Sequence, residues 1–144
     1  MKLLPVLSLS LVMLMTSSCT SQAQHNELTD EEENEGWTLL FDGESTDRWR
    51  GYNKDAFPEK GWTVEEGLLV VLADGGGGDI ITKEKYGDFV LKMEWKAAEG
   101  ANGGIFYRAM EQPSQPIYWS APEVQILDNE NHPDADQGEN GNRK

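Results

Sequence analysis

From residue 36 onward, the chain consists of short runs in which apolar and polar residues alternate. The clearest run is residues 89–96, where every second side chain from Phe89 to Trp95 is apolar and the others are mostly charged. Alternation with a period of two predicts a half-buried β-strand, with Trp95 in the core. No apolar pattern of helical spacing is long enough to predict a helix. These patterns therefore predict an all-β protein.

Turn signals separate further predicted strands. Residues 61–65 and 68–72 are joined by Glu66-Gly67, an acidic-glycine pair that favours a tight hairpin. Four consecutive glycines at residues 75–78 predict a loop, because glycine loses the most backbone entropy when it is fixed in a strand. Three more runs are strand-like: residues 37–41, 105–108 and 122–128. The first ends at a turn at Asp42-Gly43, and the second follows a turn at 101–104. Short strands with such punctuation favour a β-sandwich.

The net charge narrows the classes of partner. The 144 residues carry 26 acidic and 12 basic side chains, with a formal net charge of -14. This charge argues against nucleic acid or an anionic membrane surface as the partner. Six of the acids lie between Glu27 and Glu35 and one base precedes residue 36, so residues 36–144 hold 20 acids and 11 bases. The glycine run lacks the Lys-Ser/Thr pair of a phosphate loop, so we expect no nucleotide.

The N-terminal residues predict export. Lys2 precedes a short apolar run, which ends in small residues before the single cysteine, Cys19. This pattern indicates a secretory signal rather than a membrane span of about 20 residues. Small residues before a cysteine resemble a bacterial lipobox, which implies a lipid anchor at Cys19 and a periplasmic or cell-surface lipoprotein of the outer membrane. The alternative is ordinary cleavage after Ala23, which would remove the cysteine.

We expect three segments along the chain. Residues 1–18 form a lipoprotein-type signal peptide, residues 19–35 a flexible acidic tether, and residues 36–144 the folded part. A charged stretch such as this tether buries too little apolar surface to fold. After Asp128 the sequence is polar and predicts no closing strand, although a two-sheet sandwich needs more strands than those predicted. We therefore expect residues 36–144 to be an incomplete β-sandwich domain that lacks its C-terminal strands.

Five motifs carry a family resemblance. They are residues 36–43, 62–67, 85–89, 102–108 and 123–129, the last followed by His132-Pro133-Asp134. In this order they resemble the bacterial 3-keto-disaccharide hydrolase domain family, whose fold is a concanavalin A-like jelly roll of two antiparallel sheets. The resemblance implies a hydrolase that cleaves glycosidic bonds of 3-keto-disaccharides or 3-keto-glycosides. The alternatives are a non-catalytic lectin-like module that binds carbohydrate, and an inert surface lipoprotein.

Glu123 and Asp128 are the candidate catalytic carboxylates. In a regular strand Glu123 and Gln125 share a face and Asp128 points the other way, but a one-residue bulge would bring Asp128 to the face of Glu123. That arrangement resembles the catalytic strand of laminarinase-type glucanases, in which carboxylates on one face act as nucleophile and acid. Two carboxyl groups can cleave a glycoside directly. The other interpretation is a pair of solvated acids at the end of a strand.

A 3-keto sugar, which the resemblance implies as substrate, permits a second route. The ketone acidifies the proton on C2, so one base can begin an elimination that is followed by hydration. We expect Glu123 to be this base and Arg108 to stabilise the oxyanion, because a guanidinium supplies a positive charge and two donors. Tyr107 and Gln125 are further candidates for contact with the substrate.

His132 lies among carboxylates and is the candidate proton shuttle. It could instead be a loop histidine without a function. We expect no cofactor; the one alternative is a calcium site formed by His132 with Asp128 and Asp134. Trp119 lies in an aromatic loop and is a candidate for stacking on a sugar ring. The alternative is that an aromatic side chain of this loop packs in the core.

Overall fold

Three antiparallel strand pairs form the protein in the computed structural model, which describes residues 25–136. The pairs are β1 (Trp49–Gly51) with β4 (Ile80–Thr82), β2 (Trp62–Glu65) with β3 (Leu68–Val71), and β5 (Asn102–Phe106) with β6 (Glu123–Leu127). The helical elements are α1 (Asp30–Asn34) and two short 3₁₀ helices, Ile117–Trp119 and Pro133–Asp136. The expected all-β class with antiparallel sheets is confirmed.

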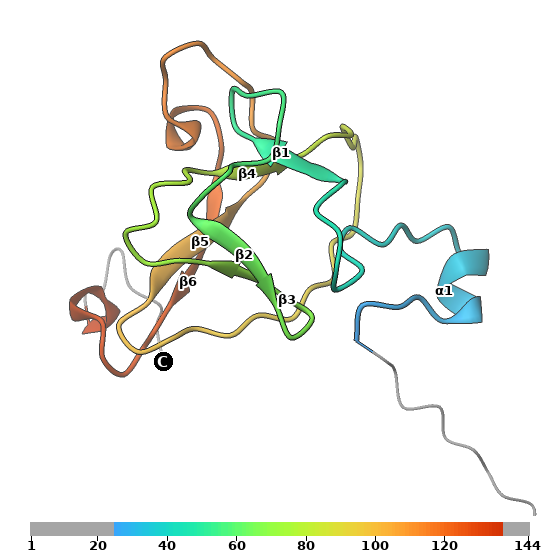
Figure 1. The fold of residues 1–144 in the computed structure, drawn as a ribbon, viewed down its shortest axis with the longest axis horizontal. Helices are drawn as coiled ribbons and strands as arrows, with labels where there is room; N and C mark the ends of the chain where they lie inside the picture. The colour runs from blue at the N-terminus through green and yellow to red at the C-terminus, as the bar shows by residue number, and fades with distance from the viewer. Residues whose placement is uncertain (1–24, 137–144) are drawn as a thin grey trace, which may run out of the picture.

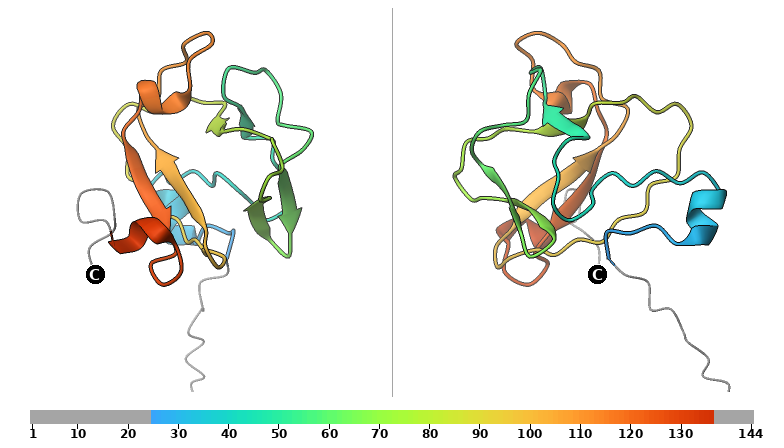
Figure 2. Two further views of the ribbon diagram at one scale, coloured as in Figure 1. Left: turned by 90° about the vertical axis from the view of Figure 1, so that its left-hand side faces the viewer. Right: turned by 45° about the vertical axis from the view of Figure 1, so that its right-hand side comes forward.

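The strand pairs are arranged in two groups. In Figure 1 the β5–β6 pair overlaps β2 in the view, and the left view of Figure 2 shows β5–β6 on one side of the molecule and β1–β4 with β2–β3 on the other. No helix within residues 25–136 is long and apolar enough to cross a bilayer. The expected signal peptide and Cys19 lie outside the described residues.

The β2–β3 hairpin forms where the sequence predicts it. Glu66 and Gly67 both have left-handed backbone angles, with φ of 50° and 76°, which is the geometry of a type I′ turn. The glycine run at 75–78 is a loop, as expected, and it packs closely on the start of β2. A Cβ on Gly77 would collide with the carbonyl of Lys60, so only glycine fits there.

Neither β1 nor β4 is predicted by the alternation of side chains. Each strand has three residues, which is too short to show a period. Trp49 in β1 donates its indole N–H to the carbonyl of Leu40 at 2.7 Å, which ties the preceding segment to the sheet.

Residues 30–34 of the expected tether form the short helix α1. Thr29 and Glu32 form a reciprocal capping box at the start of α1: the backbone N–H of Glu32 donates to the Thr29 hydroxyl at 3.2 Å. Acidic residues in the first turn are also favoured by the helix dipole. Glu32 contacts Lys92 at 3.4 Å, which connects α1 to the rest of the domain.

Two expected strands do not pair with any strand in the described part of the chain. They are residues 37–41 and residues 89–96, and the second run is extended without a ladder partner. The expectation that Trp95 lies in the core is wrong, because 55% of it is exposed. An alternating pattern indicates that one face of a segment can be buried. It does not indicate whether a neighbouring strand is present to form hydrogen bonds with the backbone.

The β5–β6 pair has a regular register from Asn102 opposite Leu127 to Phe106 opposite Glu123. The predicted turn at 101–104 lies earlier, at Glu99-Gly100, so both Gly103 and Gly104 belong to β5. The pair contains no bulge, so the condition under which Asp128 would return to the face of Glu123 is not met.

An ion pair holds the loop after β5 against the β1 region. Arg50 binds Glu111 through two hydrogen bonds, of 2.6 and 2.7 Å, and the backbone N–H of Asn53 donates to the same carboxylate at 2.9 Å. The Arg50 guanidinium is the main cause that lowers the pKa of Glu111 from 4.5 to about 2. The two side chains are only 19% and 30% exposed, so solvent screens this pair less than a surface pair.

We expect Glu111→Gln to reduce the free energy of unfolding by about 1.5–3 kcal/mol at neutral pH, the range for a hydrogen bond to a charged group. Because folding lowers the pKa of Glu111 from 4.5 to about 2, its contribution is complete above pH 4.5 and is lost as the pH falls towards 2. Urea unfolding of both proteins across this pH range measures the difference, which should shrink in acid.

Glu84→Gln is the matched control. Glu84 faces Arg48 at 4.0 Å and both side chains are exposed, so its loss should change the unfolding free energy by less than about 1 kcal/mol. Equal effects of the two substitutions would contradict the role given to Glu111.

Candidate functional site

The polar face is the side of the β5–β6 pair that carries Asn102, Gly104, Glu123 and Gln125. These residues share one face because side chains alternate along each strand and the register is regular. The exposed Glu123 side chain lies over Gly104, where any Cβ would collide with the carboxylate. Gly104 therefore provides the space that lets this carboxylate lie across the sheet.

His132 joins the polar face at the end marked by Asn102. Its Nε2 lies 3.4 Å from the Asn102 side-chain nitrogen, and the Gln125 amide donates to Asn102 Oδ1 at 3.1 Å. The ring Nδ1 accepts the backbone N–H of Asp134 at 3.1 Å, so the neutral ring carries its proton on Nε2, towards Asn102. The Nε2–H needs an acceptor, and it has one when the amides of Asn102 and Gln125 are both turned: Asn102 Oδ1 then accepts from Nε2–H, and the Asn102 nitrogen donates to the Gln125 amide oxygen.

Asp128 organises the loop that holds His132. Its carboxylate accepts the backbone N–H of Gly100 at 2.7 Å, the Asn131 side chain at 2.8 Å and the backbone N–H of Glu130 at 3.0 Å. The Gly100 N–H is the largest of the causes that lower the pKa of Asp128 from 3.8 to about 2. Asp128 is therefore an ionised anchor whose oxygens are already engaged.

Arg108 and Tyr107 lie at a different place from Glu123. Tyr107 follows β5 and its backbone N–H donates to the carbonyl of Pro122, so alternation sends its side chain to the opposite face. Arg108 has a φ of 55°, which breaks the alternation, and its guanidinium lies 3.9 Å from Asp88. The expectation that Arg108 and Glu123 share one site is therefore not met.

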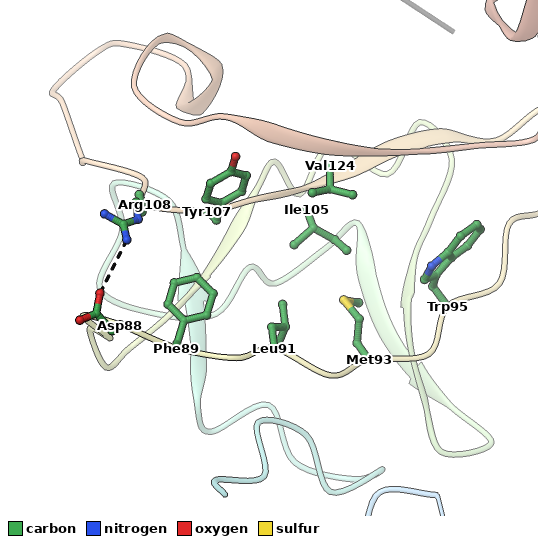
Figure 3. Close-up of a pocket in the computed structure, with 9 residues that line it drawn as sticks. All are labelled: Asp88, Phe89, Leu91, Met93, Trp95, Ile105, Tyr107, Arg108 and Val124. Atoms are coloured by element: carbon green, nitrogen blue, oxygen red, sulfur yellow. Dashed lines mark ion pairs between the residues drawn. The ribbon is translucent and has the colours of Figure 1, made fainter. Parts of the chain in front are cut away.

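The opposite face of the pair contributes to an apolar groove of about 570 Å³. Its walls are Phe89, Leu91, Met93 and Trp95 from the extended segment, and Ile105 and Val124 from the sheet. Figure 3 shows the four side chains of the segment pointing towards the sheet, with Arg108 and Asp88 at one end.

Trp119 is 70% exposed at the end of a 3₁₀ helix, and its neighbour Tyr118 is 65% exposed. Ile117 in the same turn is only 2% exposed and anchors it. The alternative that Tyr118 or Trp119 packs in the core is therefore wrong. Stacking of Trp119 on a sugar stays a prediction.

The three side chains considered for calcium do not form a metal site in the structure. Within residues 25–136, no group of three or more His, Cys, Asp or Glu side chains is placed to hold a metal ion. His132 Nδ1 lies 3.8 Å from Asp134, but the Asp128 carboxylate is directed to Gly100 and its own loop.

Sequence reasoning missed Asn102 and Gly104 as members of the site. Both lie in a segment that was expected to turn, since Ala-Asn-Gly-Gly is rich in turn residues. Pairing this segment in register with residues 123–127 would have placed them beside Gln125 and Glu123.

Residues 36–143 match the sequence model of the 3-keto-alpha-glucoside-1,2-lyase-like domain family. The chain belongs to this family. The family resemblance expected from the motifs is confirmed.

Two relatives extend this comparison. The 3-keto-disaccharide hydrolase of Bacteroides thetaiotaomicron is 45% identical over 126 residues, which cover 76% of this chain and 43% of that protein. The crystal structure of a protein from Parabacteroides distasonis, described as a glycosyl hydrolase, has a TM-score of 0.62 and 31% identity; the match covers 82% of this chain and 54% of the other. The jelly-roll class is confirmed, and this lyase-like chain spans about half the length of these relatives.

We expect Asp128→Ala to loosen the His132 loop of this lyase-like domain, because three hydrogen bonds lose their acceptor. Amide exchange of Gly100 and Glu130 should accelerate at least about tenfold, as measured by NMR. Glu130→Ala removes a neighbouring acid but leaves the Asp128 carboxylate in place, and it should leave the Gly100 amide unchanged. Unchanged exchange of Gly100 in Asp128→Ala would contradict the anchoring role.

Proposed function

We propose that the polar face is the active site of a hydrolase that cleaves 3-keto-glycosides by elimination and hydration. The observation that carries this proposal is the Glu123 carboxylate lying across Gly104 beside the amides of Gln125 and Asn102. The family description, 3-keto-alpha-glucoside-1,2-lyase-like, and the hydrolase name of the Bacteroides relative support this chemistry.

Glu123 acts as the base in this mechanism. Its carboxylate removes the proton on C2, and the electrons move to the C3 carbonyl to form an enolate. Side-chain amide N–H groups of the polar face stabilise the enolate oxygen, as donors do in an oxyanion hole. Strand geometry puts Gln125 about 7 Å from Glu123 along the chain, so both can face one sugar ring.

Loss of the leaving group completes the first half of the reaction. The enolate re-forms the carbonyl as the C1–O bond breaks, which leaves a double bond between C1 and C2. The imidazolium form of His132 donates its Nε2 proton to the departing oxygen and becomes neutral, in line with general acid catalysis. Water then adds: its oxygen bonds to C1 and one of its protons returns to His132. The exposed carboxyl of Glu123, after exchange with solvent, delivers a proton to C2, so that the net reaction is hydrolysis.

The alternative of direct hydrolysis by two carboxylates has less support. Glu123 and Asp128 are not brought to one face by a bulge, and Asp128 is held by three donors with a pKa of about 2. A carboxyl group with such a pKa is ionised at neutral pH and cannot serve as the acid. Arg108, in the groove, is not part of this mechanism.

The remaining sequence-based expectations are part of the same proposal. Export, with a lipid anchor at Cys19, would place the enzyme at the outer membrane or in the periplasm. We propose no cofactor, because the steps above use only side chains and water.

Turnover of a chromogenic 3-keto-glucoside tests the role of Glu123. Glu123→Gln should lower kcat/KM at least about 100-fold, the usual contribution of a general base. Gly104→Ala keeps the carboxylate but displaces it and should also lower kcat/KM. Glu65→Gln, an exposed acid at the end of β2, is the control and should be neutral.

The reaction in D₂O separates the two routes. Elimination and hydration place a solvent deuteron on C2 of the released keto sugar, whereas direct hydrolysis leaves that hydrogen in place. NMR of the product, corrected for exchange without enzyme, gives the answer. Retention of the C2 hydrogen, or full turnover by Glu123→Gln, would refute the proposed mechanism.

The exposed aromatic pair favours a second candidate function, which is carbohydrate binding without catalysis. Tyr118 and Trp119 present flat apolar surfaces to solvent, as in sugar-stacking sites. Calorimetry with unmodified and 3-keto disaccharides distinguishes the functions. A lectin should bind both sugars and lose at least about tenfold affinity in Trp119→Ala, with no turnover of either sugar.

A further inference from the structure

The two ends of the polar face differ in chemistry. At the His132 end, the loop after β6 exposes three polar residues, which are Asn129, Glu130 and Asn131. At the Glu123 end, the residue paired with Glu123 is an aromatic one, Phe106, the last residue of β5. Phe106 has no role in the mechanism proposed above, although it is the direct cross-strand neighbour of the base.

Phe106 lies on the same face as Glu123 and close to it. Its neighbours Ile105 and Tyr107 both line the groove on the opposite face, so alternation directs the Phe106 ring to the polar face. The backbone N–H of Tyr107 donates to the carbonyl of Pro122 at 3.1 Å. The adjacent pair, Phe106 with Glu123, is therefore the non-hydrogen-bonded type, in which opposite side chains approach most closely.

A sugar that reaches the Glu123 carboxylate also reaches the Phe106 ring. The carboxylate lies over Gly104, and strand spacing separates Gly104 from Phe106 by about 7 Å. Phe106 is only half-buried, so part of its ring is open to a ligand. The C–H groups on one side of a pyranose form an apolar surface, and a flat aromatic ring is the side chain that matches it.

A second aromatic surface lies beyond Phe106. The 3₁₀ turn before β6 presents Tyr118 and Trp119 to solvent, and Figure 3 shows the coil of this turn on the side of the strand pair away from the groove. The turn is held in place because the Ser120 hydroxyl donates to the carbonyl of Met110 at 2.8 Å. A surface that is already fixed loses little freedom when it binds a sugar.

We propose that Phe106 is the stacking surface for the 3-keto ring of the substrate. The substrate then lies along the polar face, with its keto ring at the Glu123 end and its leaving group over residues 129–131 at the His132 end. This inference rests on the proposed function, in which Glu123 removes the C2 proton and His132 protonates the leaving oxygen. A leaving group held by exposed polar side chains is a hydroxylated one, such as a second sugar.

Binding of 3-keto-glucose, the released keto sugar, tests the role of Phe106 without turnover. Phe106→Leu keeps an apolar side chain but removes the flat ring, and it should weaken binding at least about fivefold in calorimetry. Phe106→Tyr keeps the ring and should bind within about twofold of the unchanged protein. Phe89→Leu changes an aromatic residue on the groove side and is the matched control without effect.

Amide chemical shifts in the unchanged protein test the orientation of the substrate. 3-Keto-glucose should shift the amide signals of Phe106 and Glu123, whereas glucose, as the leaving sugar, should shift those of Asn129 and Glu130. Urea unfolding of Phe106→Leu and Phe106→Tyr checks that a change in affinity is not a loss of the fold.

Three results would overturn the inference. They are an absence of 3-keto-glucose binding, equal affinities of Phe106→Leu and the unchanged protein, and 3-keto-glucose shifts confined to the His132 loop. None of these measurements involves turnover. Retention of the C2 hydrogen in D₂O would refute the elimination route and leave the binding of the keto ring at Phe106 unaffected, so the two failures are distinguishable.

Discussion

The register of β5 against β6 decides which side chains can act together. Leu127 is 2% exposed at the end of this pair, and burial of a leucine stabilises a fold by about 1.5–3 kcal/mol. A slip of one residue would turn Leu127 out and move Glu123 and Gln125 to the other face. The burial of one apolar side chain thus keeps the polar row on its own side of the sheet.

The same register sends the polar row and the groove residues to opposite faces, and Leu127 and Phe106 share the face of the polar row. Glu123, Gln125 and Asn102 lie on one face, and Ile105 and Val124 turn towards the groove on the other. Glycine at position 104 adds to this separation, since it leaves space above the sheet for a carboxylate. The residues named for the polar face therefore lie in β5 and β6, except His132, which joins them from the loop after β6.

Local patterns predicted the elements whose signals are local. The β2–β3 hairpin follows from Glu66-Gly67, and β6 follows from the strand-like run at residues 122–128. The outcomes at Asp128 and Arg108 have another origin. Whether a bulge exists depends on the partner strand, and the left-handed backbone of Arg108 has no signal in its residue type. Both depend on contacts between distant parts of the chain.

The exposure of the polar face bears on which glycosidic chemistry it can support. A two-carboxylate mechanism needs one carboxyl group kept protonated near neutral pH, which takes burial or a second carboxylate close by. Glu123 is exposed, and the Asp128 carboxylate is engaged by the backbone N–H of Gly100, so these two carboxylates do not meet either condition. In the proposed elimination from a 3-keto sugar, the ketone acidifies the C2 proton that Glu123 removes, and the imidazole of His132, rather than a carboxyl group, supplies the proton to the leaving oxygen.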